Sequence, residues 1–308
     1  MQLLAVNYHY FREKKYQNGI YPLSLQEFSN QIDELSKYYN FISQEDLSNK
    51  IINNQFDNKN YCLLTFDDGL KEQMLALELL NKKGIPGLFY VTTDSIKNNS
   101  VVDVHKLHYI RSVMTDNDVY KFIDNFINLE QIKYPDNINE LYRYDTLETK
   151  KLKYLLNFIL EPKIKEEIIS KLFSTLVDET QFSKELYMNI NDIRKINSFG
   201  YLGTHTNRHL PLATLSNTLI KEEIQSSLDF LSSECKIDNI KSISYPYGGA
   251  KAVNDIVAQV SSDFSFYFGL TMFRGINSKA DFKNPFLLKR VDTNDAPGGK
   301  LQSTEFCI

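Results

Sequence analysis

The chain has 308 residues, of which 42% are hydrophobic, and it carries a formal net charge of −4. A chain of this size and composition forms one large domain or two small ones, and its near-balanced charge gives no electrostatic reason to expect nucleic acid or an anionic membrane surface as a partner. No segment approaches the roughly 18 uninterrupted apolar residues that a membrane span needs.

The first part of the chain alternates strands and helices. Residues 3–10 have the pattern of a strand, and Ser24 forms a capping box with Glu27 that opens a helix. A second, buried strand precedes residue 65, and residues 71–83 form an amphipathic helix that ends at Gly84. A further strand follows at residues 87–92. This order predicts a parallel βαβ unit.

The middle of the chain has a different pattern. From about residue 94 to residue 184 the sequence is charged, has helical periodicity and contains few glycines or prolines, and it is too long for an ordinary loop. We expect a helical insertion within a single domain that comprises residues 1–308. Such an insertion also offers a surface for a homodimer.

Alternating strands and helices resume after the insertion. The pattern predicts helices near residues 191–197, 216–233 and 254–261, and strands near residues 201–203, 241–245, 264–273 and 286–291. Repeated strands and helices in this order fit an α/β fold of the distorted (β/α) barrel type. Closing the sheet would gather the strand ends at one face.

Two adjacent carboxylates stand at the end of the second strand. Asp67 and Asp68 follow the apolar residues 61–64 and precede Gly69. Side chains of a strand alternate in direction, but a glycine lets the chain turn sharply, which would bring both carboxylates to one site. Alone, this sequence favours an ordinary turn, because aspartate and glycine are common turn residues.

Two histidines four residues apart follow a later strand. His205 and His209 come directly after the strand predicted near residues 201–203. A histidine pair can also cap or decorate a loop. One carboxylate combined with two imidazoles, however, makes a metal site with positions left open. Together the acidic pair and the histidine pair favour the metal site over either structural interpretation.

These segments resemble the motifs of the polysaccharide deacetylases with a NodB homology domain, carbohydrate esterase family four. Residues 65–69 match that family's first motif, T-F-D-D-G, letter for letter, and residues 205–209 match its second, H-[ST]-x-x-H. Residues 244–248 are similar to its third, R-x-P-[YF]-G, and the order and spacing of the motifs agree. The resemblance spans most of the chain and implies a barrel of the NodB type.

The resemblance also implies a role for each site residue. Asp68, His205 and His209 would hold a divalent metal, Zn²⁺ by default, with positions open for water and substrate. The first aspartate of the family's pair acts as general base, a role that passes to Asp67. The backbone N–H of Tyr247 would stabilise the oxyanion.

The sequence departs from the family in its third motif, which begins with Ser244 in place of arginine. We expect Arg290 to take over the arginine's task of orienting Asp67, braced by Asp292 or Asp295. An ordinary surface ion pair is the alternative interpretation of Arg290.

The family's proton donor, a histidine in a late L-x-H motif, is also missing, because no histidine follows His209. We favour His9 as the donor, since it ends the first strand and resembles a tyrosine-histidine element of some relatives. His105 and His108 at the start of the insertion, Tyr247 and metal-bound water are alternatives. Each histidine also has the plain interpretation of a hydrogen-bonded or surface residue.

The three cysteines and the N-terminal residues indicate the compartment. Cys62, Cys235 and Cys307 are odd in number and lack motif spacing, so we expect reduced thiols. The first residues lack a basic region, and their apolar stretch is too short for a signal sequence. These observations predict a cytoplasmic protein.

Together these features predict a metal-dependent hydrolase that removes an N-acetyl group from an amino sugar in a glycan, a nucleotide sugar or a lipid-linked precursor. A deformylase or another small amidohydrolase on the same metal site is one alternative. A carbohydrate-binding protein that has lost turnover is another. The missing donor and arginine favour it, but the complete set of Asp67, Asp68, His205 and His209 opposes it.

Overall fold

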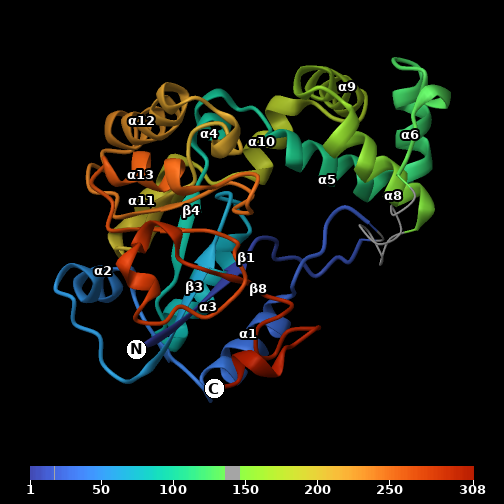
Figure 1. Ribbon diagram of the computed structural model, residues 1–308. Helices are drawn as coiled ribbons and strands as arrows, with labels where there is room; N and C mark the ends of the chain where they lie inside the picture. The colour runs from blue at the N-terminus through green and yellow to red at the C-terminus, as the bar shows by residue number, and fades with distance from the viewer. Residues whose placement is uncertain (17, 136–145) are drawn as a thin grey trace. The chain divides into compact units, whose positions relative to one another are not determined.

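The computed structural model describes residues 1–16, 18–135 and 146–308 (Figure 1). The chain forms two compact units. The first comprises residues 1–13, 22–100 and 183–308, and the second comprises residues 14–21 and 101–182. The first unit contains the sheet, and the second is helical.

The first unit is built on one parallel sheet with the strand order β7-β6-β5-β4-β3-β1-β8, in which β2 pairs with β3 at the side. The strands are β1 (Gln2–Tyr8), β2 (Asn40–Phe41), β3 (Asn60–Phe66), β4 (Leu88–Val91), β5 (Leu202–Thr204), β6 (Ser242–Ser244), β7 (Phe268–Leu270) and β8 (Val291–Asp292). The sheet curls into a half-barrel surrounded by helices, which confirms the predicted (β/α) barrel fold.

The helices of the first unit follow the strands in chain order. They are α1 (Leu25–Leu35), α2 (Gln44–Ile52), α3 (Gln73–Lys83), α4 (Thr93–Asn98), α11 (Ile190–Ser198), α12 (Asn217–Ser233) and α13 (Asp255–Ser262), with short 3-10 turns at Leu212–Thr214, Asp281–Lys283, Pro285–Leu287 and Thr304–Phe306. The predicted capping box opens α1, where Ser24 accepts a hydrogen bond from the N–H of Glu27 and Glu27 accepts one from the N–H of Ser24. The predicted stop of α3 at Gly84 is also present, with φ at 65°.

Alternate residues of the strands face two different cores. In β1, Leu4 and Val6 pack with side chains of the surrounding helices, whereas Leu3 and Ala5 pack with side chains of other strands inside the half-barrel. A strand buried on both faces has a nearly continuous apolar sequence, as β1 does. The odd-numbered residues of β1 therefore point inward, toward the interior in which the polar site is built.

Some predicted elements differ from the structure. The sequence did not indicate β2 or α2, although the side chain of Ser43 caps α2 by accepting from the N–H of Asp46. The strand predicted near residues 286–291 is wrong over most of its length, because a 3-10 turn begins at Pro285. Beyond it, the side chain of Asn277 bonds the N–H and the carbonyl of Lys289 in place of a neighbouring strand.

The second unit contains α5 (Asp103–Val113), α6 (Asp116–Asp124), η1 (Leu129–Gln131), α8 (Leu147–Tyr154), the π-helical η2 (Leu155–Ile159) and α9 (Pro162–Ser174), while α10 (Glu179–Leu186) leads back to the first unit. The described part of the predicted insertion is thus helical. Its place within a single domain stays a prediction. Among the described helices, none has both the length and the apolar character needed to span a membrane.

Candidate active site

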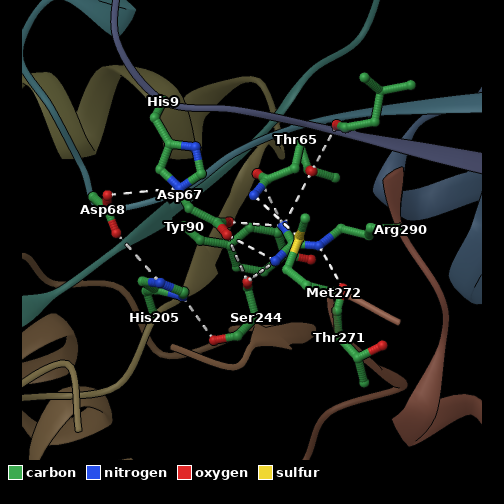
Figure 2. Close-up of polar contacts among 12 residues, drawn as sticks. His9, Thr65, Asp67, Asp68, Tyr90, His205, Ser244, Thr271, Met272 and Arg290 are labelled. Carbon is green, nitrogen blue, oxygen red and sulfur yellow. Dashed lines mark hydrogen bonds and ion pairs between the residues drawn. The ribbon is translucent and has the colours of Figure 1, made fainter. Parts of the chain in front are cut away.

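Polar residues that are far apart in the sequence meet at the carboxyl ends of the strands (Figure 2). Asp67 follows β3, His205 follows β5, and His9 lies one residue beyond the end of β1. Parallel strands present their carboxyl ends at one edge, which is where α/β folds place their chemistry. The structure therefore brings the predicted acidic and histidine motifs together.

The acidic motif turns at Asp68 as well as at the glycine that follows. Asp68 has φ of 78° and Gly69 has φ of 68°, both in the left-handed region. This turn departs from the alternation of a strand, so that Asp67 points toward Arg290 and Asp68 toward the histidines. Left-handed backbone at non-glycine residues costs of order 1–3 kcal/mol and collects at functional sites. The sharp turn gives the two adjacent carboxylates different partners.

Asp67 forms a two-pronged ion pair with Arg290. The guanidinium donates from Nη1 to Oδ1 at 2.9 Å and from Nη2 to Oδ2 at 2.7 Å. Arg290 is wholly buried, so the alternative of a surface ion pair is wrong. Ser244, at the position of the family's arginine, donates through Oγ to Asp67 Oδ2 at 3.1 Å and accepts from Arg290 Nη2 at 2.9 Å. The hydroxyl thus joins both members of the pair.

Residues other than the predicted aspartates brace Arg290. Its Nε donates to the carbonyl of Thr271 at 2.9 Å, and its Nη1 lies 3.2 Å from both Asn7 Oδ1 and Thr65 Oγ1. The expectation that Asp292 or Asp295 braces it is wrong. Asp292 accepts from Asn294, and Asp295 pairs with Arg274. The backbone carbonyl of Thr271 and polar side chains on the inner face of β1 and β3 provide the bracing instead.

The charge of Arg290 sets the ionisation of Asp67. Burial alone would raise the pKa of this carboxyl, but the guanidinium of Arg290, helped by His205, outweighs that effect and lowers the pKa below its ordinary value. Asp67 is therefore a carboxylate at neutral pH. A general base needs that protonation state.

Asp68, His205 and His209 converge on one point. Asp68 Oδ1 lies 3.4 Å from His205 Nε2 and 3.3 Å from His209 Nε2, and one ligand atom from each of the three buried residues falls within 4.8 Å of the others. Two ligands held about 2.1 Å from one ion in tetrahedral geometry are about 3.4 Å apart. The spacing and the donor atoms fit a divalent metal.

Contacts outside this group orient the two imidazoles. The Nδ1 of His205 lies 2.8 Å from the carbonyl of Ser244, which leaves its Nε2 directed at Asp68. Burial lowers the pKa of His205, but the carboxylates of Asp67 and Asp68 outweigh it and the net pKa is raised. Anionic surroundings that attract a proton also attract a metal ion in its place.

A buried carboxylate on α12 holds the loop between the histidines. Glu223 accepts from the N–H of Arg208 at 2.9 Å and from Arg208 Nε at 2.5 Å. On either side of Arg208, Thr206 and His209 have φ of 64° and 59°. Because a β-branched residue rarely adopts positive φ, the loop needs such anchors. The sequence carried a signal for this role, since Glu223 interrupts the buried face of α12.

The third motif forms a tight turn after β6. Tyr247 has φ of 62°, and Gly248 has φ of 59° and lies so close to Met272 that a Cβ atom would stand 2.5 Å from the Met272 nitrogen. The Tyr247 ring is half exposed and lies edge-on to the His209 ring, 4.9 Å away. The motif therefore adjoins the metal-binding group.

The candidate proton donors lie in different parts of the fold. His9 lies beside Asp68, with 3.9 Å between Nε2 and Asp68 Oδ2, and its side chain is 39% exposed (Figure 2). His105 and His108 are on α5 in the second unit, with their ring centroids 6.1 Å apart, and His105 is buried. Within the first unit, His9 and Tyr247 are thus the candidates that lie beside the metal-binding group.

Comparison with known proteins identifies the family. The polysaccharide deacetylase family model matches residues 54–268, more than two thirds of the chain. The chain therefore belongs to the polysaccharide deacetylase family, as its motifs predicted. Membership supports deacetylase activity. The matched span includes the acidic and histidine motifs, whereas His9 and Arg290 lie outside it.

Three solved structures share the fold. The Streptococcus pyogenes deacetylase PplD in complex with acetate has a TM-score of 0.62 at 17% identity, covering 99% of both chains. IcaB from Ammonifex degensii has a TM-score of 0.57 at 16% identity over 94% of this chain and 91% of its own. A de-N-acetylase from Aggregatibacter actinomycetemcomitans has a TM-score of 0.58 at 12% identity, covering 94% of each chain. Among the curated proteins, none matches the chain.

Proposed function

We propose that the protein is a metal-dependent hydrolase that removes an N-acetyl group from an amino sugar. One observation carries the proposal: a buried Asp-His-His group of metal-ligand type adjoins a second carboxylate, Asp67, which Arg290 keeps ionised. An ion pair that serves stability alone needs one carboxylate. Here Asp67 pairs with Arg290, while the adjacent Asp68 lies beside His205 and His209. Membership of the polysaccharide deacetylase family supports the same reaction.

The proposed cofactor is Zn²⁺, held by Asp68, His205 and His209, because one carboxylate oxygen and two imidazole nitrogens are ligands that zinc accepts. When bound, such an ion supplies a Lewis acid for the acyl carbonyl and lowers the pKa of water. The rest of the reaction depends on groups of the protein.

The proposed roles follow the positions of the residues. Asp67 takes the proton that water loses as its oxygen bonds to the acyl carbon, and Arg290 keeps the carboxylate oriented toward it. The backbone N–H of Tyr247 donates to the oxygen that gains charge. When the carbon–nitrogen bond breaks, His9 gives the departing nitrogen its proton. The products are acetate and a free amine.

The substrate and the compartment extend the proposal. We propose an N-acetylated glycan, nucleotide sugar or lipid-linked precursor and a cytoplasmic site of action, with which the free thiols of Cys62, Cys235 and Cys307 are consistent. The structure of PplD contains acetate, and acetate is also the product that the proposed reaction would release. A homodimer through the helical insertion stays a prediction.

The test is to incubate the zinc-loaded protein with N-acetylated oligosaccharides, nucleotide sugars and lipid-linked sugars and to follow the products by mass spectrometry. We expect one substrate class to exchange acetyl for hydrogen, and we expect this to stop with a chelator and in Asp67→Asn. Exchange of formyl for hydrogen would identify a deformylase instead. Sugar binding without any exchange, at full zinc occupancy, would overturn the proposal in favour of a binding protein.

A further inference from the structure

The segment that carries His9 is held by the start of α3. The ladder between β1 and β3 ends with the pair Tyr8 and Phe66, so His9 lies just beyond it. Gln73, the first residue of α3, is wholly buried. Its Nε2 donates to the carbonyl of His9 at 3.1 Å and to the carbonyl of Asp67 at 2.6 Å. One amide group therefore ties the backbone of His9 to the backbone of Asp67.

The residue before Gln73 holds the same segment farther along. Glu72 accepts from the N–H of Phe11 at 2.9 Å and from Arg12 Nε at 2.6 Å. Glu72 occupies the N-cap position of α3 but makes no side-chain cap hydrogen bond there. A side chain at this position ordinarily satisfies the helix's own N–H groups. Here the carboxylate binds residues 11 and 12 instead.

The side chain of His9 depends on this backbone support. Its imidazole is 39% exposed and 3.9 Å from Asp68 Oδ2, a separation longer than a hydrogen bond. A partly exposed ring keeps its place chiefly through the placement of its own backbone. Because misplacing a catalytic group by about 1 Å can cost about 10²-fold in rate, a clamp on the backbone affects catalysis.

We infer that Glu72 and Gln73 are positioning residues, which hold His9 where it can deliver a proton to the departing nitrogen. The inference rests on the proposed function, since it assumes that His9 is the donor. It adds that the acidic motif acts together with the residues four and five positions beyond Asp68. The turn supplies the base, and the start of the following helix positions the donor.

The test compares a leaving group that needs a proton with one that does not. An amine must be protonated as it departs, whereas 4-nitrophenolate leaves unaided. Turnover of an N-acetyl sugar and of 4-nitrophenyl acetate is measured for each zinc-loaded variant, and the amide-to-ester ratio is compared. General acid catalysis contributes about 10²–10⁴-fold. We expect His9→Ala to lower the ratio by about 10²-fold, and Gln73→Met to lower it by at least about 10-fold.

Zinc affinity provides a second readout, which we expect to be unchanged in Gln73→Met. In His9→Ala/Gln73→Met, the ratio should equal that of His9→Ala alone, because residues that act as a unit are not additive. Glu72→Met, at a less buried position, should also lower the ratio. It tests the positioning role if Gln73→Met folds poorly.

Gln44 gives a matched control. It is a buried glutamine whose Nε2 also bridges two carbonyls, those of Gly200 and Leu202. Gln44→Met should lose stability and keep the amide-to-ester ratio.

The outcomes separate the positioning role from the proposed function. If Gln73→Met and Glu72→Met keep the ratio while His9→Ala lowers it, the positioning role is wrong and the proposed deacetylase function is unaffected. If His9→Ala keeps the ratio, His9 is not the proton donor, and the positioning role of Glu72 and Gln73 is wrong as well. If the wild-type protein cleaves no amide, the proposed function itself has failed.

Discussion

Replacing Arg290 by methionine would leave Asp67 as a buried carboxylate without its counter-charge. Both side chains are at least 96% buried, and two hydrogen bonds of 2.7 and 2.9 Å join them. Removing one partner of a buried pair costs about 3–5 kcal/mol, whereas an exposed pair contributes about 0.2–1 kcal/mol. We therefore expect Arg290→Met to lower the free energy of unfolding by about 3–5 kcal/mol.

A double-mutant cycle separates this pair from its surroundings. Denaturant unfolding of the metal-free protein is measured for the wild type, Arg290→Met, Asp67→Asn and the double variant. Asparagine removes the buried charge, so the double variant should recover part of the loss. Arg274→Met is the control, because Arg274 pairs with Asp295 and its side chain is 48% exposed. A coupling energy within the range of exposed pairs, about 0.2–1 kcal/mol, would refute the reasoning.

Three further predictions concern metal binding and pH. Asp67→Asn should keep bound zinc and lose about 10²–10⁴-fold in turnover, whereas His205→Ala should lose the metal. Metal analysis and an acetate-release assay on both variants check these two outcomes. Glu223→Gln should weaken zinc binding by about 10–100-fold in chelator competition, because the histidine loop loses its anchor; an unchanged affinity would contradict this. Burial raises the pKa of Asp116, but hydrogen bonds from Arg111 and Thr149 outweigh it and lower the pKa. The resulting stability is present above the unfolded pKa of about 3.9 and is lost as the pH falls through the folded value. Asp116→Asn should flatten the dependence of the unfolding midpoint on pH below about 4.

The parts of the site that lie close together in the sequence could be predicted from it. Asp67 and Asp68 are adjacent, and His205 and His209 are four residues apart, so short motifs contain them with their spacing. The order of strands and helices likewise predicted the sheet, since local periodicity and capping residues determine where most elements begin. Local signals were sufficient for these features.

Contacts between distant elements could not be predicted in the same way. Arg290 is 223 residues from Asp67, and the sequence alone left an exposed ion pair open as an alternative. Its bracing by Thr65 and Asn7 depends on which residues of β1 and β3 face inward, which becomes certain only when the register of the sheet is known. The contact of Gln73 with two backbone carbonyls leaves no sequence pattern at all.

The most direct test of the account is a titration of acetate release against added Zn²⁺, starting from the metal-free protein and an N-acetylated oligosaccharide. If Asp68, His205 and His209 hold one ion that the reaction needs, turnover should rise with added metal, reach a plateau at one equivalent and vanish with a chelator. Turnover that is already complete in the metal-free protein, or full zinc binding by His205→Ala, would contradict the central claim.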